Sequence, residues 1–389
     1  MDERTEKALQ YLDKHEAQMI ETWKNIVCME SHSSEIENVN KILAHLDTYC
    51  DALQMQRKIV PYEKAGSGFV AATKPGKYKP VALLGHVDTV HRSGAFGSEP
   101  FLRQGDLVTG PGVMDCKGGV TAALYVIRAL RHIGYEDRQV KLILSGDEEV
   151  AHSFSHGEGG LLFEQECKGC AAALNTEPAT MDGSITLQRK GGAIFEIEVF
   201  GKAAHAGKEP EKGANAIRQA AEMICRIERE TVFRKTTYNC GLIQGGKGAN
   251  VVPDYCRFDV GVRYETNQQY QQAQQMLQKL CEEPAVPGTH CEMRQNGFYP
   301  AMEKTPQSEQ LFALYQTVCT RMGGPAPQGI AQGGCSDSAF ASRIGVPTLC
   351  GMGVHGEGAH TLQEWAKVSS LLLQAKRLTA LILALPPEF

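Results

Sequence analysis

The sequence predicts an α/β protein with a mostly parallel sheet flanked by helices and with a smaller α+β domain inserted in the chain. Short apolar runs bounded by turn residues alternate with helical patterns, which is typical of strands buried on both faces of a parallel sheet. The middle of the chain has a different order of strands and helices. The length of 389 residues exceeds the usual span of one hydrophobic core, so two domains are expected.

The two outer parts of the chain are predicted to form the larger domain. Hydrophobic periodicity predicts helices over 4–28, 34–56, 120–133, 308–322 and 364–385, and a hairpin over 59–73 around Gly66 and Gly68. Buried strands are predicted at four apolar runs: Val81–Leu84, Val140–Leu144, Ala171–Leu174 and Val346–Leu349.

The inserted domain is predicted from the order of elements that follows Gly192. That order is strand 194–200, helix 214–229, strands 236–243 and 255–264, helix 268–283 and strand 291–296. It is the split β-α-β unit of a ferredoxin-like domain. We therefore expect residues 1–190 and 305–389 to form one discontinuous domain and residues 191–304 to form the insertion.

Composition and charge exclude several classes of protein. The net charge of −5 comes from interspersed acids and bases without a basic stripe, which argues against nucleic acid as a partner. The charged N-terminal segment lacks the apolar core of a secretory signal, and no run approaches a membrane span, so a cytosolic protein is expected. The 13 cysteines are scattered, which favours reduced, mostly buried thiols, and the single pair Cys167 and Cys170 lacks a partner pair for a zinc finger.

Acidic and histidine side chains follow four of the apolar runs. In open α/β sheets, ligands bind beyond the carboxyl ends of the strands, so we expect these side chains to converge. Asp115 adds a carboxylate in a glycine-rich turn just before the 120–133 helix, where small residues let the backbone approach a ligand. The side chains at the strand ends are His86 and Asp88, then Asp147, Glu148 and Glu149, then Glu177, and finally His355 and His360.

This inventory of two histidines and three to five carboxylates suits borderline divalent metals such as zinc and cobalt. The two oxygens of Asp115 could bridge a pair of ions about 3.5 to 4 Å apart, with a shared water at the open position. Asp88 is expected to accept the spare N–H of His86 and to fix its tautomer. Glu148 and Glu149 are consecutive and must diverge, so one can bind metal while the other serves as general base.

Seven segments, in this order along nearly the whole chain, resemble the metal-dependent carboxypeptidases, aminoacylases and deacylases that include bacterial glutamate carboxypeptidase. These segments are GHVDTV, GPGVMDCKGG, DEE, NTEP, GKAAHAG, NVVPD and a late GAH. The resemblance implies a zinc-peptidase-like catalytic domain and an inserted lid and dimerisation domain. It implies an enzyme that cleaves a C-terminal peptide bond or an N-acyl amino acid amide bond next to a free carboxylate, and a homodimer formed through the insertion.

The resemblance also implies roles for individual residues. One divalent ion would be held by His86, Asp115 and Glu177, and a second by Asp115, Glu149 and His360. The expected metal is Zn²⁺, and Co²⁺ or Mn²⁺ also fit. Glu148 would be the general base, and His205 in GKAAHAG would stabilise the oxyanion, often from the partner subunit. The implied substrate-binding residues are Arg263, Asn250, Gly333, Gly334 and Ser336.

Two departures from the family pattern and three alternatives stay open. The segment after DEE is longer than usual and carries His152 and His156, and His355 competes with His360 as a metal ligand. Within the same class, the enzyme could be an N-acyl amino acid deacylase. In other classes, it could be a cysteine hydrolase using Cys335 or Cys116, or a noncatalytic relative that only binds metal. The charge of Asp115 next to Cys116 raises a thiol pKa and opposes the cysteine mechanism.

Overall fold

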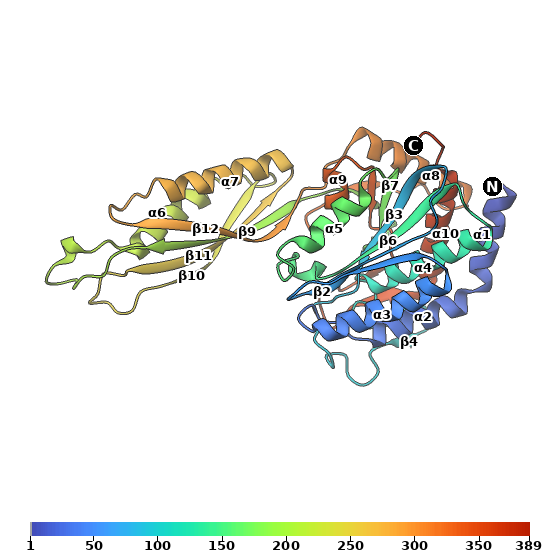
Figure 1. The fold of residues 1–389 in the computed structure, drawn as a ribbon, viewed down its shortest axis with the longest axis horizontal. Helices are drawn as coiled ribbons and strands as arrows, with labels where there is room; N and C mark the ends of the chain where they lie inside the picture. Colours follow the sequence, from blue (N-terminus) through green and yellow to red (C-terminus); the bar gives the residue numbers. More distant parts are fainter. Residues whose placement is uncertain (1) are drawn as a thin grey trace. The chain divides into compact units, whose positions relative to one another are not determined.

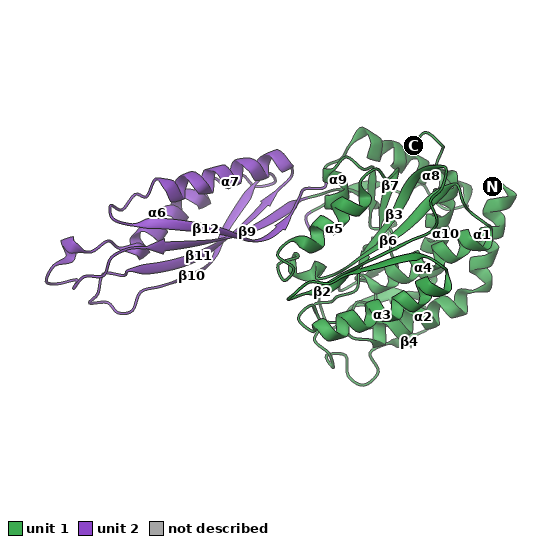
Figure 2. Cartoon of the chain, in the orientation of Figure 1, with its two compact units in different colours: residues 1–189, 303–332, 336–389 green, residues 190–302, 333–335 purple. Residues whose placement is uncertain are grey.

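The structure is a computed structural model that describes residues 2–389. The chain divides into two compact units, coloured separately in Figure 2. The large unit contains the chain through Arg189, together with Glu303–Gln332 and Ser336–Phe389. The small unit contains Lys190–Met302 and Gly333–Cys335.

The large unit is built on an eight-stranded sheet in the order β1-β2-β6-β3-β7-β14-β8-β13. Its centre is parallel, because β6, β3, β7 and β14 pair in the same direction. The β1, β2 and β6 pairings are antiparallel, β14 meets β8 in antiparallel register, and β8 pairs in parallel with β13. The strands are β1 Gln56–Val60, β2 Gly66–Ala72, β3 Tyr78–His86, β6 Arg138–Gly146, β7 Ala172–Asn175, β8 Ile185–Arg189, β13 Gly329–Gln332 and β14 Thr348–Cys350.

Helices cover both faces of this sheet, which confirms the predicted fold class. Figure 1 shows α5 and α9 on one side and α2, α3 and α4 on the other. The α4 helix packs on α1, α2 and α10, and α5 packs on α9. The helices are α1 Glu3–Lys14, α2 Glu16–Cys28, α3 Ile36–Ala52, α4 Lys117–His132, α5 Glu158–Cys167, α8 Pro306–Arg321, α9 Ser338–Arg343 and α10 Val368–Ala384, with a single 3-10 turn at Glu148–Val150.

The small unit has the predicted β-α-β-β-α-β order. Its antiparallel sheet runs β10-β11-β9-β12, and α6 and α7 pack on it. Burial alternates along β11, as expected for a sheet with one covered face. The elements are β9 Gly191–Phe200, a 3-10 turn Pro210–Lys212, α6 Ala216–Arg229, β10 Thr237–Gly245, β11 Tyr255–Tyr264, α7 Asn267–Glu282 and β12 His290–Tyr299.

Four predicted elements were wrong in detail. The helix over 4–28 is two helices, because the chain turns at His15, whose N–H bonds the Leu12 carbonyl at 3.0 Å. Gly66 and Gly68 lie inside β2, where a Cβ at Gly66 would lie 2.3 Å from the Val39 side chain, so this glycine permits close packing under α3. The helix predicted from residue 364 begins only at α10, and α3 ends four residues before the predicted residue 56.

The segment before α10 belongs to a small second sheet that the sequence did not predict. Its order is β15-β16-β5-β4. Strands of two or three residues are too short to give an alternating pattern. The strands are β4 Leu102–Gln104, β5 Leu107–Thr109, β15 Gly356–Glu357 and β16 Trp365–Lys367.

The α4 helix lies directly against the carboxyl end of β7. A Cβ on Gly119 would lie 1.9 Å from the Thr176 carbonyl oxygen, so only glycine fits there. Trp23 of α2 is fully buried beneath the preceding turn and donates its indole N–H to the Val113 carbonyl at 3.0 Å. These contacts hold the loop that carries Asp115 at the carboxyl end of the central strands.

Replacing Gly119 with Ala should lower the free energy of unfolding by about 1 to 3 kcal/mol because of overpacking. The substitution would otherwise stabilise a helix, since Ala exceeds Gly in helix propensity by ~1 kcal/mol. Urea unfolding of the variant measures the change. Gly324→Ala, where the added Cβ meets only ordinary contacts of 3.4 Å or more, is the control. Equal stabilities of the two variants would contradict this packing.

Candidate metal centre

The side chains at the ends of the central strands come together in the large unit. His86 is the last residue of β3, Glu148 begins the 3-10 turn after β6, and Glu177 follows β7. Asp115 lies just before α4, and His360 lies between β15 and β16. Parallel strands deliver three of these side chains to the same edge of the sheet, and the two loops complete the cluster.

Asp115 occupies the middle of the cluster. Its Oδ1 lies 3.0 Å from His86 Nε2, and its Oδ2 lies 3.5 Å from His360 Nε2. Glu177 Oε1 lies 3.7 Å from His86 Nε2, and Glu149 Oε2 lies 2.9 Å from His360 Nε2. Each oxygen of Asp115 therefore faces a different histidine, and each histidine is also beside one glutamate.

The carboxylates of the cluster are buried, and burial dominates their electrostatics. Burial raises the pKa of Glu177 to about 8, and it raises the pKa of Glu149 to about 7 against the hydrogen bond with His360. Burial would also raise the pKa of Asp115, but hydrogen bonds from His360 and His86 outweigh it and lower that pKa. The hydrogen bonds to Asp115 and Glu149 raise the pKa of His360 to about 11.

This donor set fits divalent cations. Ligand atoms of His86, Asp115 and Glu149 lie within 4.8 Å of one another. Clustered buried carboxylates repel one another unless they are protonated or paired with cations. Carboxylate oxygens combined with imidazole nitrogens are donors that zinc, cobalt and manganese accept.

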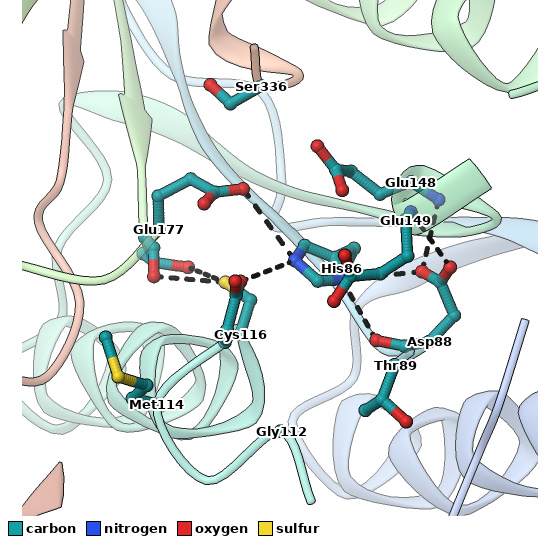
Figure 3. Close-up of polar contacts among 12 residues, drawn as sticks. His86, Asp88, Thr89, Gly112, Met114, Cys116, Glu148, Glu149, Glu177 and Ser336 are labelled. Carbon is teal, nitrogen blue, oxygen red and sulfur yellow. Dashed lines mark hydrogen bonds and ion pairs between the residues drawn. The ribbon is translucent and has the colours of Figure 1, made fainter. Parts of the chain in front are cut away.

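Asp88 supports the cluster through hydrogen bonds. The Nδ1 of His86 lies 3.1 Å from the main-chain oxygen of Asp88 and 3.4 Å from its carboxylate, so the nearer acceptor is the carbonyl and not the predicted side chain. The Asp88 carboxylate instead accepts the N–H groups of Glu148 and Glu149, both at 3.1 Å, and the Ser33 hydroxyl at 2.7 Å. One buried residue thus orients both the imidazole and the Glu148 turn (Figure 3).

Glu148 and Glu149 diverge, as expected for consecutive residues. Figure 3 shows the Glu148 side chain running away from Glu149. Burial raises the pKa of Glu148 well above its usual range, and the negative charge of Glu177 adds to the shift against the opposing charge of His86. A buried carboxylate beside the candidate metal ligands is a candidate for proton transfer.

Glu364 is a buried residue of this region that the sequence analysis missed. Its Oε1 accepts the N–H groups of Met114 and Asp115 at 2.9 and 3.1 Å, and its Oε2 accepts the N–H of Gly112 at 3.0 Å. His91 Nε2 also contacts Oε2 at 3.2 Å. Glu364 therefore holds the Asp115 loop. The available signal was an acid four residues after His360. Hydrophobic periodicity predicts the start of a helix at residue 364, so the sequence did not indicate Glu364 as a residue of the site.

Cys116 and His355, both considered from the sequence, have other partners. The Cys116 thiol donates to the Thr176 carbonyl at 3.1 Å, although its sulfur also lies within 4.8 Å of donor atoms of His86 and Glu177. Burial raises the pKa of this thiol well above its usual range, which keeps it protonated in the absence of a cation. His355 Nδ1 donates to the Thr180 carbonyl at 2.6 Å, so His360 and not His355 contacts Asp115.

Four of the predicted substrate-handling residues, and the oxyanion histidine, lie in the small unit. His205 is exposed, bridges to Val251, and accepts the Gly207 N–H at 3.1 Å. The carbonyl of Asn250 accepts the Ala206 N–H at 3.0 Å, so Asn250 lies beside His205. Exposed Arg263 donates to the Cys335 sulfur at 2.8 Å, next to Gly333 and Gly334. In the large unit, buried Ser336 contacts Ser338 Oγ at 2.5 Å.

Comparison with known proteins relates this chain to a group of peptidases. Residues 187–289 match the M20_dimer model, described as the peptidase dimerisation domain. Carboxypeptidase G2 from Pseudomonas sp. (strain RS-16) is 26% identical over 309 residues, covering 79% of this chain and 74% of its own length. The chain is therefore similar to the M20 peptidases, and residues 187–289 match their dimerisation domain. These similarities support an enzyme, a hydrolase of the peptidase and amidohydrolase class.

Two further similar proteins are named for different activities. Acetylornithine deacetylase from Myxococcus xanthus is 31% identical over 238 residues, which is 57% of either chain. The YXEP protein of Bacillus subtilis, a dinuclear metal binding peptidase, shares the fold with a TM-score of 0.64 and 17% identity over 95% of this chain and 98% of its own. Across residues 2–389, no helix has the length and apolar character needed to span a membrane.

Metal content should separate the contributions of His360 and His355 to metal binding. We expect the unmodified protein to retain two zinc ions after dialysis, His360→Ala about one, and Asp115→Asn fewer than one, because Asp115 faces both His86 and His360. Inductively coupled plasma mass spectrometry gives the stoichiometry.

His355→Gln is the matched control and should keep both ions, since His355 is bonded to Thr180. Full metal content in Asp115→Asn, or metal loss in His355→Gln but not in His360→Ala, would contradict this assignment.

Proposed function

We propose that this M20 enzyme uses two divalent ions to hydrolyse a C-terminal peptide bond or an N-acyl amino acid amide bond next to a free carboxylate. The observation that carries the proposal is that the two oxygens of Asp115 face different histidines, at 3.0 and 3.5 Å. The proposed ligand sets are His86, Asp115 and Glu177 for one ion, and Asp115, Glu149 and His360 for the other. Zinc is the proposed metal, with cobalt and manganese compatible with the same donors.

Glu148 is the proposed general base. When bound, the two divalent metal ions supply a Lewis acid for the scissile carbonyl and lower the pKa of a water in the site. Glu148 takes the proton of the attacking water and returns it to the leaving nitrogen. Nearby cations favour the ionised form of this buried carboxylate, which otherwise has a raised pKa.

The small unit is proposed to supply the remaining groups. His205 would stabilise the oxyanion, and its exposed side chain is free to enter a site outside its own unit. Arg263 and Asn250 would bind the substrate carboxylate, because a guanidinium can hold a carboxylate with two hydrogen bonds. Gly333, Gly334 and Ser336 would line the substrate pocket. The match of residues 187–289 to a dimerisation domain supports a homodimer through this unit.

A deacylase that acts on N-acyl amino acids is the second candidate. The similarity to acetylornithine deacetylase over 57% of the chain favours it, and the glutamate-type carboxypeptidase rests on the similarity to carboxypeptidase G2. A cysteine hydrolase is disfavoured because burial raises the pKa of the Cys116 thiol. A noncatalytic role is disfavoured by the presence of Glu148 beside the complete ligand set.

A substrate panel tests the proposed reaction. We expect hydrolysis of N-acyl amino acids or of dipeptides with C-terminal glutamate, and a loss of at least ~100-fold in kcat/KM when the free carboxylate is converted to a primary amide. Chelation should abolish activity and thiol alkylation should leave it. Equal rates on acid and amide would contradict the carboxylate requirement, and inhibition by alkylation but not by chelation would revive a cysteine mechanism.

Glu148→Gln should lower kcat by about 10²- to 10⁴-fold, because the amide cannot accept a proton from water. The zinc content should remain that of the unmodified protein, since Glu148 is not a proposed ligand. Steady-state kinetics and metal analysis of the same preparation measure both quantities. Retention of kcat within threefold would remove Glu148 from the mechanism.

Mixed dimers test the position of His205. If it acts across the dimer, an equal mixture of His205→Ala and Glu148→Gln protomers should recover about a quarter of the unmodified activity, because half of the dimers then carry one intact site. Activity is measured after refolding or exchange of the two purified variants. No recovery in verified heterodimers would show that His205 acts within its own subunit, and an active His205→Ala homodimer would show that His205 plays no part.

A further inference from the structure

A buried histidine joins two aspartates beside the candidate metal centre, and the proposed mechanism does not use it. His152 Nδ1 lies 3.0 Å from Asp147 Oδ1, and His152 Nε2 lies 2.7 Å from Asp337 Oδ1. The imidazole is 0% exposed. Carboxylate oxygens only accept hydrogen bonds, so both ring nitrogens donate and the ring is a cation between two anions. We call these three residues the His152 clamp.

The His152 clamp is tightly enclosed. The ring of Phe340 packs edge-on against the imidazole at a centroid distance of 5.5 Å, and Phe163 lies at 6.4 Å. A Cβ on Gly159 would lie 2.5 Å from both His152 Nδ1 and Asp147 Oδ1. The clamp therefore has no room for a different ring position, which fixes the two aspartates relative to each other.

The clamp connects two loops that reach the site from different parts of the sheet. Asp147 directly precedes Glu148, and its Oδ2 accepts the Ser155 N–H at 3.0 Å, which closes the turn after β6. Asp337 directly follows Ser336 and precedes α9. We propose that His152 is a positioning residue that locks the turn carrying Glu148 to the loop carrying Ser336, a role that rests on the proposed function of Glu148.

The energetics of burying charge favour a role for His152 in positioning the two loops over a role in the overall stability of the protein. Burying a charged triad is costly, and replacing such groups by apolar residues is often neutral or favourable for stability. An apolar replacement would lose the two directional hydrogen bonds that hold the charged groups in a fixed geometry. Asp337 Oδ2 is buried without a hydrogen-bond partner among residues 2–389, so the bond from His152 to Oδ1 is a large part of what stabilises that carboxylate.

His152→Asn removes the clamp with a matched control in the same loop. His152 and His156 both have a φ of 53°, a left-handed conformation that Asn tolerates well. His156 is exposed, so His156→Asn changes a histidine at the same backbone conformation outside the clamp. Asn at position 152 is too short to bond both aspartates at once.

Hydrogen exchange of the zinc-loaded protein gives a readout independent of activity. The proposal predicts at least ~10-fold faster exchange over 147–159 and 336–343 in His152→Asn, no change over 140–144, and no change in His156→Asn. Unchanged exchange in both loops of His152→Asn would overturn the clamp, whether or not the enzyme accepts the proposed substrates.

Kinetics then test the positioning role. We expect kcat to fall about 10- to 100-fold in His152→Asn, with KM within twofold and zinc content unchanged. The double variant His152→Asn/Asp337→Asn removes one unpaired buried charge and should recover Tm while kcat stays low. Recovery of kcat together with Tm, or loss of zinc in proportion to kcat, would overturn positioning in favour of a structural role. If the unmodified protein cleaves none of the panel, the proposed function fails while the exchange result still decides the clamp.

Discussion

The concentration of negative charge around Asp115 is the constraint on which the rest of the site depends. Asp115, Glu148, Glu149 and Glu177 are gathered by separate segments into a space where burial raises the pKa of three of them. Two histidines provide only part of the compensating charge. Divalent cations between these side chains would turn mutual repulsion into attraction, and the same ions would supply the chemistry of amide hydrolysis.

The surrounding residues make that arrangement rigid. Asp88 binds the Glu148 turn through two main-chain N–H groups, and Glu364 binds the Asp115 loop through three. The His152 clamp adds a connection from the Glu148 turn to the loop before α9. Each of these carboxylates is buried and accepts at least one hydrogen bond that orients a loop at the edge of the sheet.

The sequence predicted the parts of the molecule that strong local patterns encode. The apolar runs predicted the central strands, and the histidine and acids at their ends predicted the convergence of His86, Glu149 and Glu177, because strand exits meet in parallel sheets. The sequence did not predict the contacts of Glu364 or the Asp337 partner of His152, since those contacts join residues 249 and 185 positions apart, and no local spacing encodes them. The short strands β15 and β16 were missed for the same reason: their pairing is tertiary, and two or three residues carry no period.

X-ray absorption at the zinc edge of the loaded protein tests the central claim most directly. Two ions bridged by Asp115 predict a zinc–zinc scattering feature at about 3.5 to 4 Å and a first shell of nitrogen and oxygen at about 2.0 to 2.2 Å. The account is contradicted if the spectrum contains no metal–metal feature at two zinc ions per chain. It is also contradicted if the first shell is dominated by sulfur at about 2.3 Å, which would assign the site to cysteine ligands and not to the carboxylate cluster.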